Sequence, residues 1–252
     1  MPVLFLFRYI TNLYRTWYFS RNFHTQTSLE VIGYGEFSET FRNHKGKRSQ
    51  KWSHYLPIYD EAVLEVKEKF GTDISILEIG VQAGGSLEIW RSIFGQKAKI
   101  YEIDIDSNCG KLKLNAEIRI GSTANKDFLK RVAEEIGTAN IIIDDGSHDS
   151  KHQRKAFEVF FPHLIENGLY VIEDLEHSYY WSKHGGYLRG KSIIERAKRL
   201  VDDLNSDYFH SPRLKSFGIN THEVQSVTFY PGLLIIRKSQ RLKPSIVWAG
   251  RG

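Results

Sequence analysis

The sequence predicts an α/β protein: a doubly wound, mostly parallel sheet that closes with a C-terminal antiparallel hairpin. Strand-like and helix-like segments alternate from residue 75 to residue 173, which is typical of right-handed crossovers in a parallel sheet. Two apolar runs, 141–143 and 169–172, have the composition of strands that are buried on both faces. Pro231-Gly232 is a turn signal between two further strand-like segments, so these should pair as a hairpin.

The individual elements follow from the same patterns. An amphipathic helix over 57–70 leads into the sheet, and residues 30–54 before it are polar and glycine-containing, which predicts a loop-rich connection. A helical stretch over 190–205 has the apolar spacing of a core-facing helix. The expected strands are 75–79, 99–104, 117–120, 140–144, 168–173, 222–230 and 232–238, and the expected crossover helices are 86–95, 124–137 and 151–166.

Composition limits the class of protein. A chain of 252 residues, 41% of them hydrophobic, can build one large α/β domain or two small ones. We expect an N-terminal segment and linker over 1–54, a catalytic domain over 55–240 and a tail over 241–252. The single cysteine, Cys109, excludes a disulfide framework and a cysteine-based zinc site. It fits a reducing compartment, so we expect a cytoplasmic location.

The net charge of +5 is unevenly distributed. Residues 1–55 carry eight Lys or Arg against three Glu, and residues 233–252 carry five Lys or Arg and no acid, so the centre of the chain is acidic. A nucleic-acid-binding protein would gather basic residues on one recognition element. The pattern therefore disfavours nucleic acid as a partner.

The first 29 residues contain no acid and have the periodicity of a basic, aromatic amphipathic helix. Its apolar run is too short to span a bilayer or to act as a secretory signal. Two interpretations stay open: peripheral membrane contact through residues 1–20, and docking on the protein's own surface or on a second subunit of a homo-oligomer.

A glycine turn after the strand at 75–79 predicts a ligand site. Gly80 and Gly84 lead into the next helix, whose free N–H groups and dipole favour a carboxylate or phosphate, and Ser86 would suit the N-cap. Asp104 ends the next strand 24 residues after Gly80, where an acid binds ribose hydroxyls in doubly wound folds. The alternative is a simple turn with a solvated acid. Gly-x-x-x-Gly differs from the dinucleotide pattern and favours another adenosine-bearing molecule.

Acidic residues also end two of the buried strands. Asp144 and Asp145 follow one apolar run, and Glu173 and Asp174 follow the other. Because ligands bind at the carboxyl ends of parallel strands, these groups should meet there. Carboxylates together with the imidazole of His148 can hold a hard divalent cation and supply a base. Asp144 should face away from Asp145, towards a cofactor or a backbone amide.

At these residues the chain resembles the class I S-adenosylmethionine-dependent methyltransferases, which have a Rossmann-like seven-stranded sheet. Glu78-Ile79-Gly80 with Gly84 is similar to their first motif, and Gly121-Ser122-Thr123 stands where many relatives show Gly-Asp-Gln. The resemblance covers about residues 55–240 and implies S-adenosylmethionine as the cofactor. The residues expected to bind it are Glu78, Gly80, Gly84, Ser86, Asp104, Ser122 and Asp144.

A narrower resemblance is to the metal-dependent sugar O-methyltransferases of macrolide biosynthesis, the macrocin and mycinamicin type. It is carried by Asp145-Gly-Ser-His148 followed by Ile172-Glu173-Asp174, and by an upstream segment from Lys51 to Tyr59. It implies Mg²⁺ or Mn²⁺ bound by Asp145, Glu173 and Asp174, with His148 as the catalytic base. Substrate contacts are expected from His54, Tyr55, Tyr59, Tyr179 and His184.

Residues 177–191 form an aromatic, glycine-rich segment directly after the second acidic pair. Such a segment is either a substrate lid or a plain surface loop. The sequence as a whole predicts methyl transfer to a hydroxyl of a sugar or a glycosylated small molecule. The alternatives are a methyltransferase of another small hydroxyl or phenol, and a catalytically silent binding module with the same fold.

Overall fold

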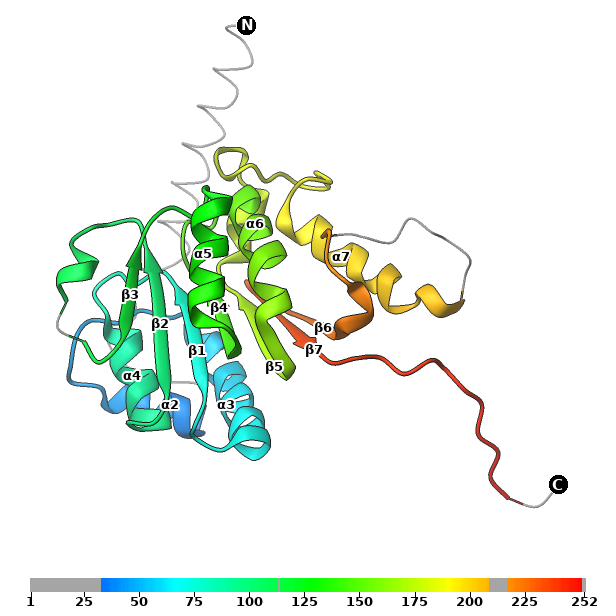
Figure 1. Cartoon of the computed structure of the whole chain (residues 1–252), viewed down its shortest axis with the longest axis horizontal. Helices are drawn as coiled ribbons and strands as arrows, with labels where there is room; N and C mark the ends of the chain where they lie inside the picture. Colours follow the sequence, from blue (N-terminus) through cyan, green and yellow to red (C-terminus); the bar gives the residue numbers. More distant parts are fainter. Residues whose placement is uncertain (1–32, 113, 209–216, 251–252) are drawn as a thin grey trace, which may run out of the picture.

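The computed structural model describes residues 33–112, 114–208 and 217–250. Two layers of helices enclose a central sheet, with α2, α3 and α4 on one face and α5, α6 and α7 on the other (Figure 1). The helices are α2 Glu36–Asn43, α3 Leu56–Phe70, α4 Gly85–Phe94, α5 Lys126–Ile136, α6 Ser150–Phe160 and α7 Ile193–Leu204. The strands are β1 Ser75–Ile79, β2 Lys99–Asp104, β3 Glu117–Ile120, β4 Ala139–Asp144, β5 Leu164–Ile172, β6 Val224–Tyr230 and β7 Leu233–Lys238.

The seven strands lie in the order β3-β2-β1-β4-β5-β7-β6. The first five strands in sequence are parallel, and β7 pairs antiparallel with both β5 and β6. The strands from β1 to β3 are added towards one edge of the sheet, and β4 and β5 are added on the other side of β1, because β2 and β4 both flank β1. The predicted doubly wound sheet with its C-terminal hairpin is therefore confirmed.

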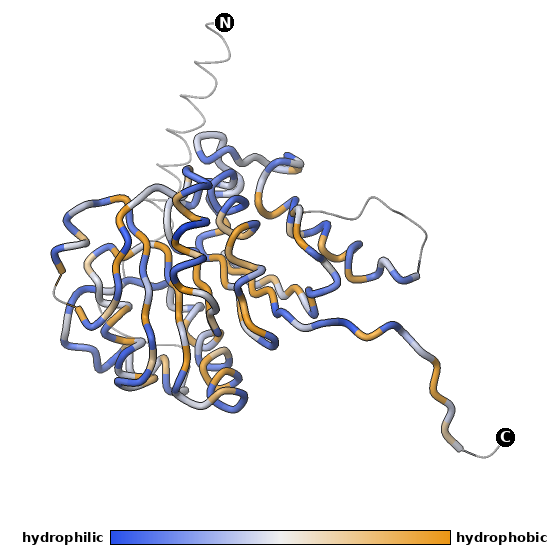
Figure 2. The backbone as a smooth tube through the Cα atoms, viewed as in Figure 1, coloured by the Kyte–Doolittle hydropathy of each residue, from blue (hydrophilic) through white to orange (hydrophobic). Residues whose placement is uncertain are grey.

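The apolar side chains of the strands alternate between two cores, one on each face of the sheet. In β4, Ile141 and Ile143 join the core under α3 and α4, and Ile142 joins the core under α5 and α6. Figure 2 shows the matching pattern, with apolar backbone positions concentrated on the strands and on the helix sides that face them. Continuous apolar runs in the sequence follow from this burial on both faces.

The prediction of a loop-rich connection over 30–54 is wrong at residues 36–43, which form α2. Phe37 is buried and stacks on Tyr59 of α3 at 4.7 Å between ring centroids. Asp60, also on α3, accepts hydrogen bonds from the Gly35 and Ser38 backbone N–H groups at 3.0 and 2.7 Å. The helix thus receives its N-terminal cap from a residue 22 positions away, which the local sequence does not reveal.

The expected helix over 151–166 is also too long. The α6 helix ends at Phe160, a short 3-10 turn over Phe161–His163 contains Pro162, and β5 already begins at Leu164. The proline fits the first turn of this 3-10 segment, where its missing N–H is not needed.

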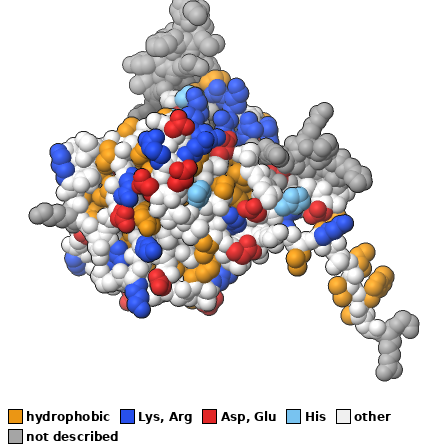
Figure 3. Space-filling view, in the orientation of Figure 1, with side chains coloured by type: hydrophobic (Ala, Val, Ile, Leu, Met, Phe, Trp, Pro, Cys, Tyr) orange, Lys and Arg blue, Asp and Glu red, His pale blue; other side chains and the backbone are white. Residues whose placement is uncertain are grey.

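Among the described residues, no helix has both the length and the hydrophobicity needed to cross a bilayer. The N-terminal segment for which membrane contact was considered lies outside the described residues. At the other end of the chain, residues 242–250 run away from the body in an extended path (Figure 1). Figure 3 shows hydrophobic side chains along this tail. The highly exposed ones are Leu242, Ile246, Val247 and Trp248.

Candidate active site

Neighbouring strands place the acidic groups side by side. In the parallel pairing of β4 with β5, Asp144 lies opposite Ile172, so the next residues, Asp145 and Glu173, emerge together at the end of the sheet. Asp145, Glu173 and Asp174 can each direct a carboxylate oxygen so that the three atoms lie within 4.8 Å of one another. The structure brings these residues together as the sequence predicts. Three oxygen donors at this spacing fit a hard divalent cation.

The segment before α3 supplies the hydrogen bonds that hold this cluster. The Lys51 ammonium donates to Asp145 Oδ2 and to Glu173 Oε1, both at 2.6 Å, and its Nζ lies 3.9 Å from Glu78 Oε1. The Tyr59 hydroxyl donates to Glu173 Oε1 at 2.5 Å. The sequence indicates Lys51 only as the first residue of the segment that resembles the sugar O-methyltransferases. Nothing in the local sequence predicts that this lysine contacts acids so far along the chain.

Asp174 is held by two aromatic residues of the same segment. The Trp52 indole N–H donates to Asp174 Oδ1 at 3.0 Å. The Tyr55 hydroxyl donates to the Gly232 carbonyl at 2.7 Å and accepts the Asp174 backbone N–H at 3.3 Å. Tyr55 and Tyr59 are buried, with exposures of 0% and 2%, so their positions favour support of the acids over direct contact with a substrate. Their expected substrate role stays a prediction.

The pKa values of the cluster reflect its burial and its excess of negative charge. Burial, followed by the charge of Asp145, raises the pKa of Glu173 to about 8. Burial and the neighbouring Glu176 raise the pKa of Asp174 to about 6. Burial lowers the pKa of Lys51, but the carboxylates raise it more, and the net pKa is well above the ordinary value. Lys51 therefore remains protonated, and one ammonium faces several crowded acids.

His148 lies beside the acids on the loop that leaves β4. Its Nε2 is 3.6 Å from Asp174 Oδ2, and its ring stacks on His177 at 4.8 Å between centroids. Burial lowers the pKa of His148 to about 4, so the imidazole is neutral at physiological pH and is a weaker base than an ordinary histidine. His148 and Asp174 both have positive φ, 51° and 54°, a backbone region that non-glycine residues adopt at a cost and often at functional sites.

The glycine turn lies directly against the acidic cluster. A side chain at Gly80 would come within 2.4 Å of the Asp145 carbonyl oxygen, and Gly80 has a φ of +111°, so only glycine fits there. Asp104 accepts hydrogen bonds from the backbone N–H groups of Val81 and Gln82 at 2.9 and 3.3 Å. Asp104 is thus fixed beside the turn, where the predicted ribose site lies.

The remaining predicted cofactor residues occupy different positions. Glu78 is buried and accepts the Trp90 indole N–H at 2.8 Å. The prediction that Ser86 caps α4 is wrong: the N-cap is Gly84 in the left-handed conformation, and Ser86 lies inside the helix. Ser122 lies in the loop after β3, where its hydroxyl accepts the Ala124 backbone N–H at 3.2 Å.

Asp144 faces away from Asp145, as the strand alternation predicts. Its carboxyl group accepts a hydrogen bond from the backbone N–H of Gly146, which is one of the two expected partners. Burial raises its pKa to about 7. Asp144 also adds negative charge beside the buried Tyr170, which belongs to the core under α6.

The segment after β5 folds back over the start of α6. It contains two 3-10 helices, Leu175–Tyr179 and Trp181–Lys183. His184 Nδ1 lies 2.6 Å from Asp149 Oδ2, and Lys183 donates to the Ser147 carbonyl at 2.7 Å. Tyr179 is 36% exposed, and the His54 imidazole lies 3.0 Å from the Pro231 carbonyl. The structure therefore fastens residues 177–191 next to His148, where Tyr179 and His184 were expected to meet a substrate.

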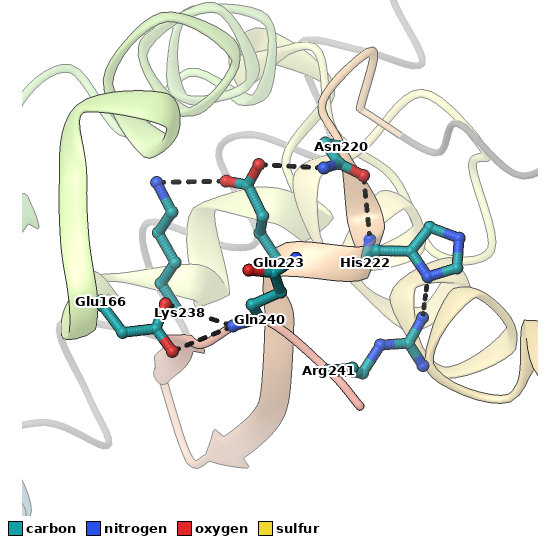
Figure 4. Close-up of a pocket in the computed structure, with 7 residues that line it drawn as sticks. All are labelled: Glu166, Asn220, His222, Glu223, Lys238, Gln240 and Arg241. Carbon is teal, nitrogen blue, oxygen red and sulfur yellow. Dashed lines mark hydrogen bonds and ion pairs between the residues drawn. The ribbon is translucent and has the colours of Figure 1, made fainter. Parts of the chain in front are cut away.

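A hollow of about 560 Å³ lies elsewhere, at the opposite end of β5 and β7 (Figure 4). The charged groups that line it are already paired. Lys238 Nζ lies 3.1 Å from Glu223 Oε2, and Glu166 accepts hydrogen bonds from the Ser239 hydroxyl and the Gln240 backbone N–H. These contacts fasten the hairpin to the start of β5. His222 and Arg241 also line the hollow and contact each other at 3.5 Å. The acidic cluster instead places three carboxylates and a histidine beside the glycine turn, which makes it the better candidate site.

A sheet of this order, with a glycine turn after β1, an acid at the end of β2 and a C-terminal antiparallel hairpin, is the Rossmann-like fold of the class I S-adenosylmethionine-dependent methyltransferases. No protein-family model matches the sequence. Individual relatives do match, and they narrow the class.

These homologues are sugar O-methyltransferases, so the resemblance seen in the sequence is confirmed. The chain is 30% identical over 222 residues to 8-demethyl-8-(2-methoxy-alpha-L-rhamnosyl)-tetracenomycin-C 3'-O-methyltransferase of Streptomyces olivaceus, covering 84% of this chain and 56% of the relative. It is 31% identical to demethylmacrocin O-methyltransferase of Streptomyces fradiae, over 75% of this chain and 50% of that protein.

The structure also superposes on a solved relative. The MycE methyltransferase of the mycinamycin biosynthetic pathway, solved with Mg and SAH, has a TM-score of 0.73 and 26% identity over 88% of this chain and 58% of that chain. The chain thus spans about half the length of the curated relatives it matches.

Proposed function

We propose that this chain is an S-adenosylmethionine-dependent O-methyltransferase that acts on a sugar hydroxyl of a glycosylated small molecule and uses a divalent metal ion. The observation that carries the proposal is the cluster of Asp145, Glu173 and Asp174, whose oxygens lie within 4.8 Å of one another beside the glycine turn. The names of the relatives support the sugar acceptor, and the MycE complex with Mg, SAH and mycinamycin VI supports both the donor and the metal.

The three carboxylates would hold the metal. Only oxygen donors are offered, which suits Mg²⁺ or Mn²⁺. When bound, such an ion favours the deprotonated form of an adjacent hydroxyl. Burial, followed by neighbouring carboxylates, raises the pKa values of Glu173 and Asp174, which fits a site that favours additional positive charge.

Other residues of the chain would position the reactants and move the proton. His148 Nε2, neutral and only partly exposed, takes the proton from the acceptor hydroxyl. Gly80 allows the chain to pass close to the donor, and Asp104 holds the glycine turn and the ribose. Trp52, Tyr55 and Tyr59 fix the acids, which keeps the metal and the base in one geometry.

The test is methyl transfer from labelled S-adenosylmethionine to a panel of glycosides, with and without a chelator. Transfer that requires Mg²⁺ or Mn²⁺ and that falls by 10²–10⁴-fold in His148→Ala would support the proposal. Transfer that is unaffected by the chelator would reject the metal. Full activity of His148→Ala would reject the base. A phenol methylated in preference to every glycoside would reject the sugar acceptor.

A further inference from the structure

Lys51 is a buried cation inside the cluster of acids. Its side chain is 3% exposed, and its Nζ makes 2.6 Å contacts to one oxygen each of Asp145 and Glu173. These are two of the three carboxylates that would hold the metal. The ammonium therefore uses the same oxygen atoms as the proposed metal ion.

A lysine and a metal ion cannot both keep this geometry at low cost. A cation bonded to either oxygen at about 2.1 Å would lie at most about 4.7 Å from Nζ, because Nζ itself is 2.6 Å from that oxygen. A divalent ion and an ammonium at such a distance repel each other strongly in a buried site, where little water screens them. Metal binding must therefore either displace the ammonium or lose affinity to the repulsion between the two cations.

The position of Lys51 in the chain allows displacement. Residues 44–52 have no regular secondary structure, so moving the side chain breaks no helix or strand. Neighbouring residues are anchored independently: the Lys47 backbone N–H donates to Glu88 at 2.7 Å, and Trp52 donates to Asp174. The long flexible stem can thus withdraw while the segment stays in place.

We propose that Lys51 is an internal competitor of the metal ion, an ammonium that neutralises the acids in the metal-free protein and sets the metal affinity of the site. This inference rests on the proposed metal site. It assigns Lys51 as a positioning residue whose charge keeps Asp145 and Glu173 together when no metal is bound. The expected consequence is a metal affinity lower than three bare carboxylates would give.

The test compares Mn²⁺ affinity, measured from the electron paramagnetic resonance signal of the free ion, in wild type and Lys51→Met. Methionine keeps the length of the stem and removes the charge. We expect Lys51→Met to bind Mn²⁺ at least tenfold more tightly, equal to about 1.4 kcal/mol. Lys126→Met is the matched control, since Lys126 pairs with the surface residue Glu158 at 3.1 Å, and its affinity should equal that of wild type.

A purely structural role for Lys51 predicts the opposite sign, because a damaged site binds metal more weakly. Equal or weaker binding by Lys51→Met would overturn the inference and leave the proposed function intact. If neither protein binds Mn²⁺, or if Asp145→Asn binds as well as wild type, then the metal site of the proposed function fails and the inference fails with it.

Removing one buried positive charge among several acids can prevent folding. The double variant Lys51→Met/Glu78→Gln removes one charge of each sign, and Glu78 is the acid whose Oε1 lies 3.9 Å from Nζ. Glutamine can still accept the Trp90 indole N–H at this position. The double variant should also bind Mn²⁺ more tightly than wild type, and a failure to do so would overturn the inference.

Discussion

Replacing Tyr59 with phenylalanine should measure the support that the cluster of acids receives from α3. The change removes only the hydroxyl that donates to Glu173 at 2.5 Å. The ring remains stacked on Phe37 at 4.7 Å and near Trp90 at 5.7 Å, so no cavity forms. At a pH above about 8, where Glu173 is ionised, a hydrogen bond to this charged partner contributes about 1.5–3 kcal/mol, and leaving the buried acceptor short of a donor costs a similar amount. We therefore expect a loss of about 2 kcal/mol in the free energy of unfolding.

The assay is urea denaturation in the presence of a chelator, so that metal binding does not contribute. In a domain of this size the loss corresponds to a Tm about 4–8 °C lower. Tyr170→Phe is the matched control: Tyr170 is fully buried, but its hydroxyl has no hydrogen-bond partner among the described residues. Its removal should be neutral or slightly stabilising. Equal effects of the two changes would refute the assignment of the Tyr59 hydroxyl to Glu173.

Two further substitutions test the cap of α6 and the glycine turn, which both lie beside the acidic cluster. Asp149→Ala should cost about 1–2 kcal/mol, because Asp149 caps α6 by accepting two backbone N–H groups. Burial raises the pKa of Asp149, but its hydrogen bonds lower it more, to a value below the ordinary one. The stabilisation is thus complete above the ordinary Asp pKa of about 3.9 and is lost as the pH falls through the lower folded-state pKa, so urea curves of the two proteins should converge in acid. Gly80→Ala should destabilise by more than about 2 kcal/mol, because its Cβ would lie 2.4 Å from the Asp145 carbonyl oxygen. Gly71→Ala, with a φ of +69°, a ψ of −137° and no atom within 4 Å of the added Cβ, should cost only the backbone strain of about 1–3 kcal/mol. A Tm loss for Gly80→Ala no larger than that for Gly71→Ala would contradict the close approach at Gly80.

Much of the fold could be predicted because its signals are local. Buried parallel strands contain short stretches of apolar residues, and the strands expected at 75–79 and 99–104 coincide with β1 and β2. The meeting of Asp145 with Glu173 follows from topology alone, since the ends of adjacent parallel strands share one edge.

The missed features depend on partners far along the chain. The α2 helix is capped by Asp60, and Lys51 is held by acids that only the folded sheet brings near. Ser86 has the chemistry of an N-cap, but the N-cap is Gly84, two residues earlier, in the left-handed conformation. These contacts form only in the tertiary structure, so the periodicity of the sequence cannot predict them.

The donors of the acidic cluster precede its acceptors in the chain. Lys51 is separated from Asp145 by 94 residues and from Glu173 by 122. During ribosomal synthesis, at about 5–20 residues per second, the lysine emerges several seconds before its second partner exists. A nascent chain that ends before β5 would have to leave this ammonium in water. The contact between Lys51 and Glu173 thus cannot form before β5 has been synthesised, and we expect Lys51 to react faster with acylating reagents in products truncated before β5 than in the complete chain.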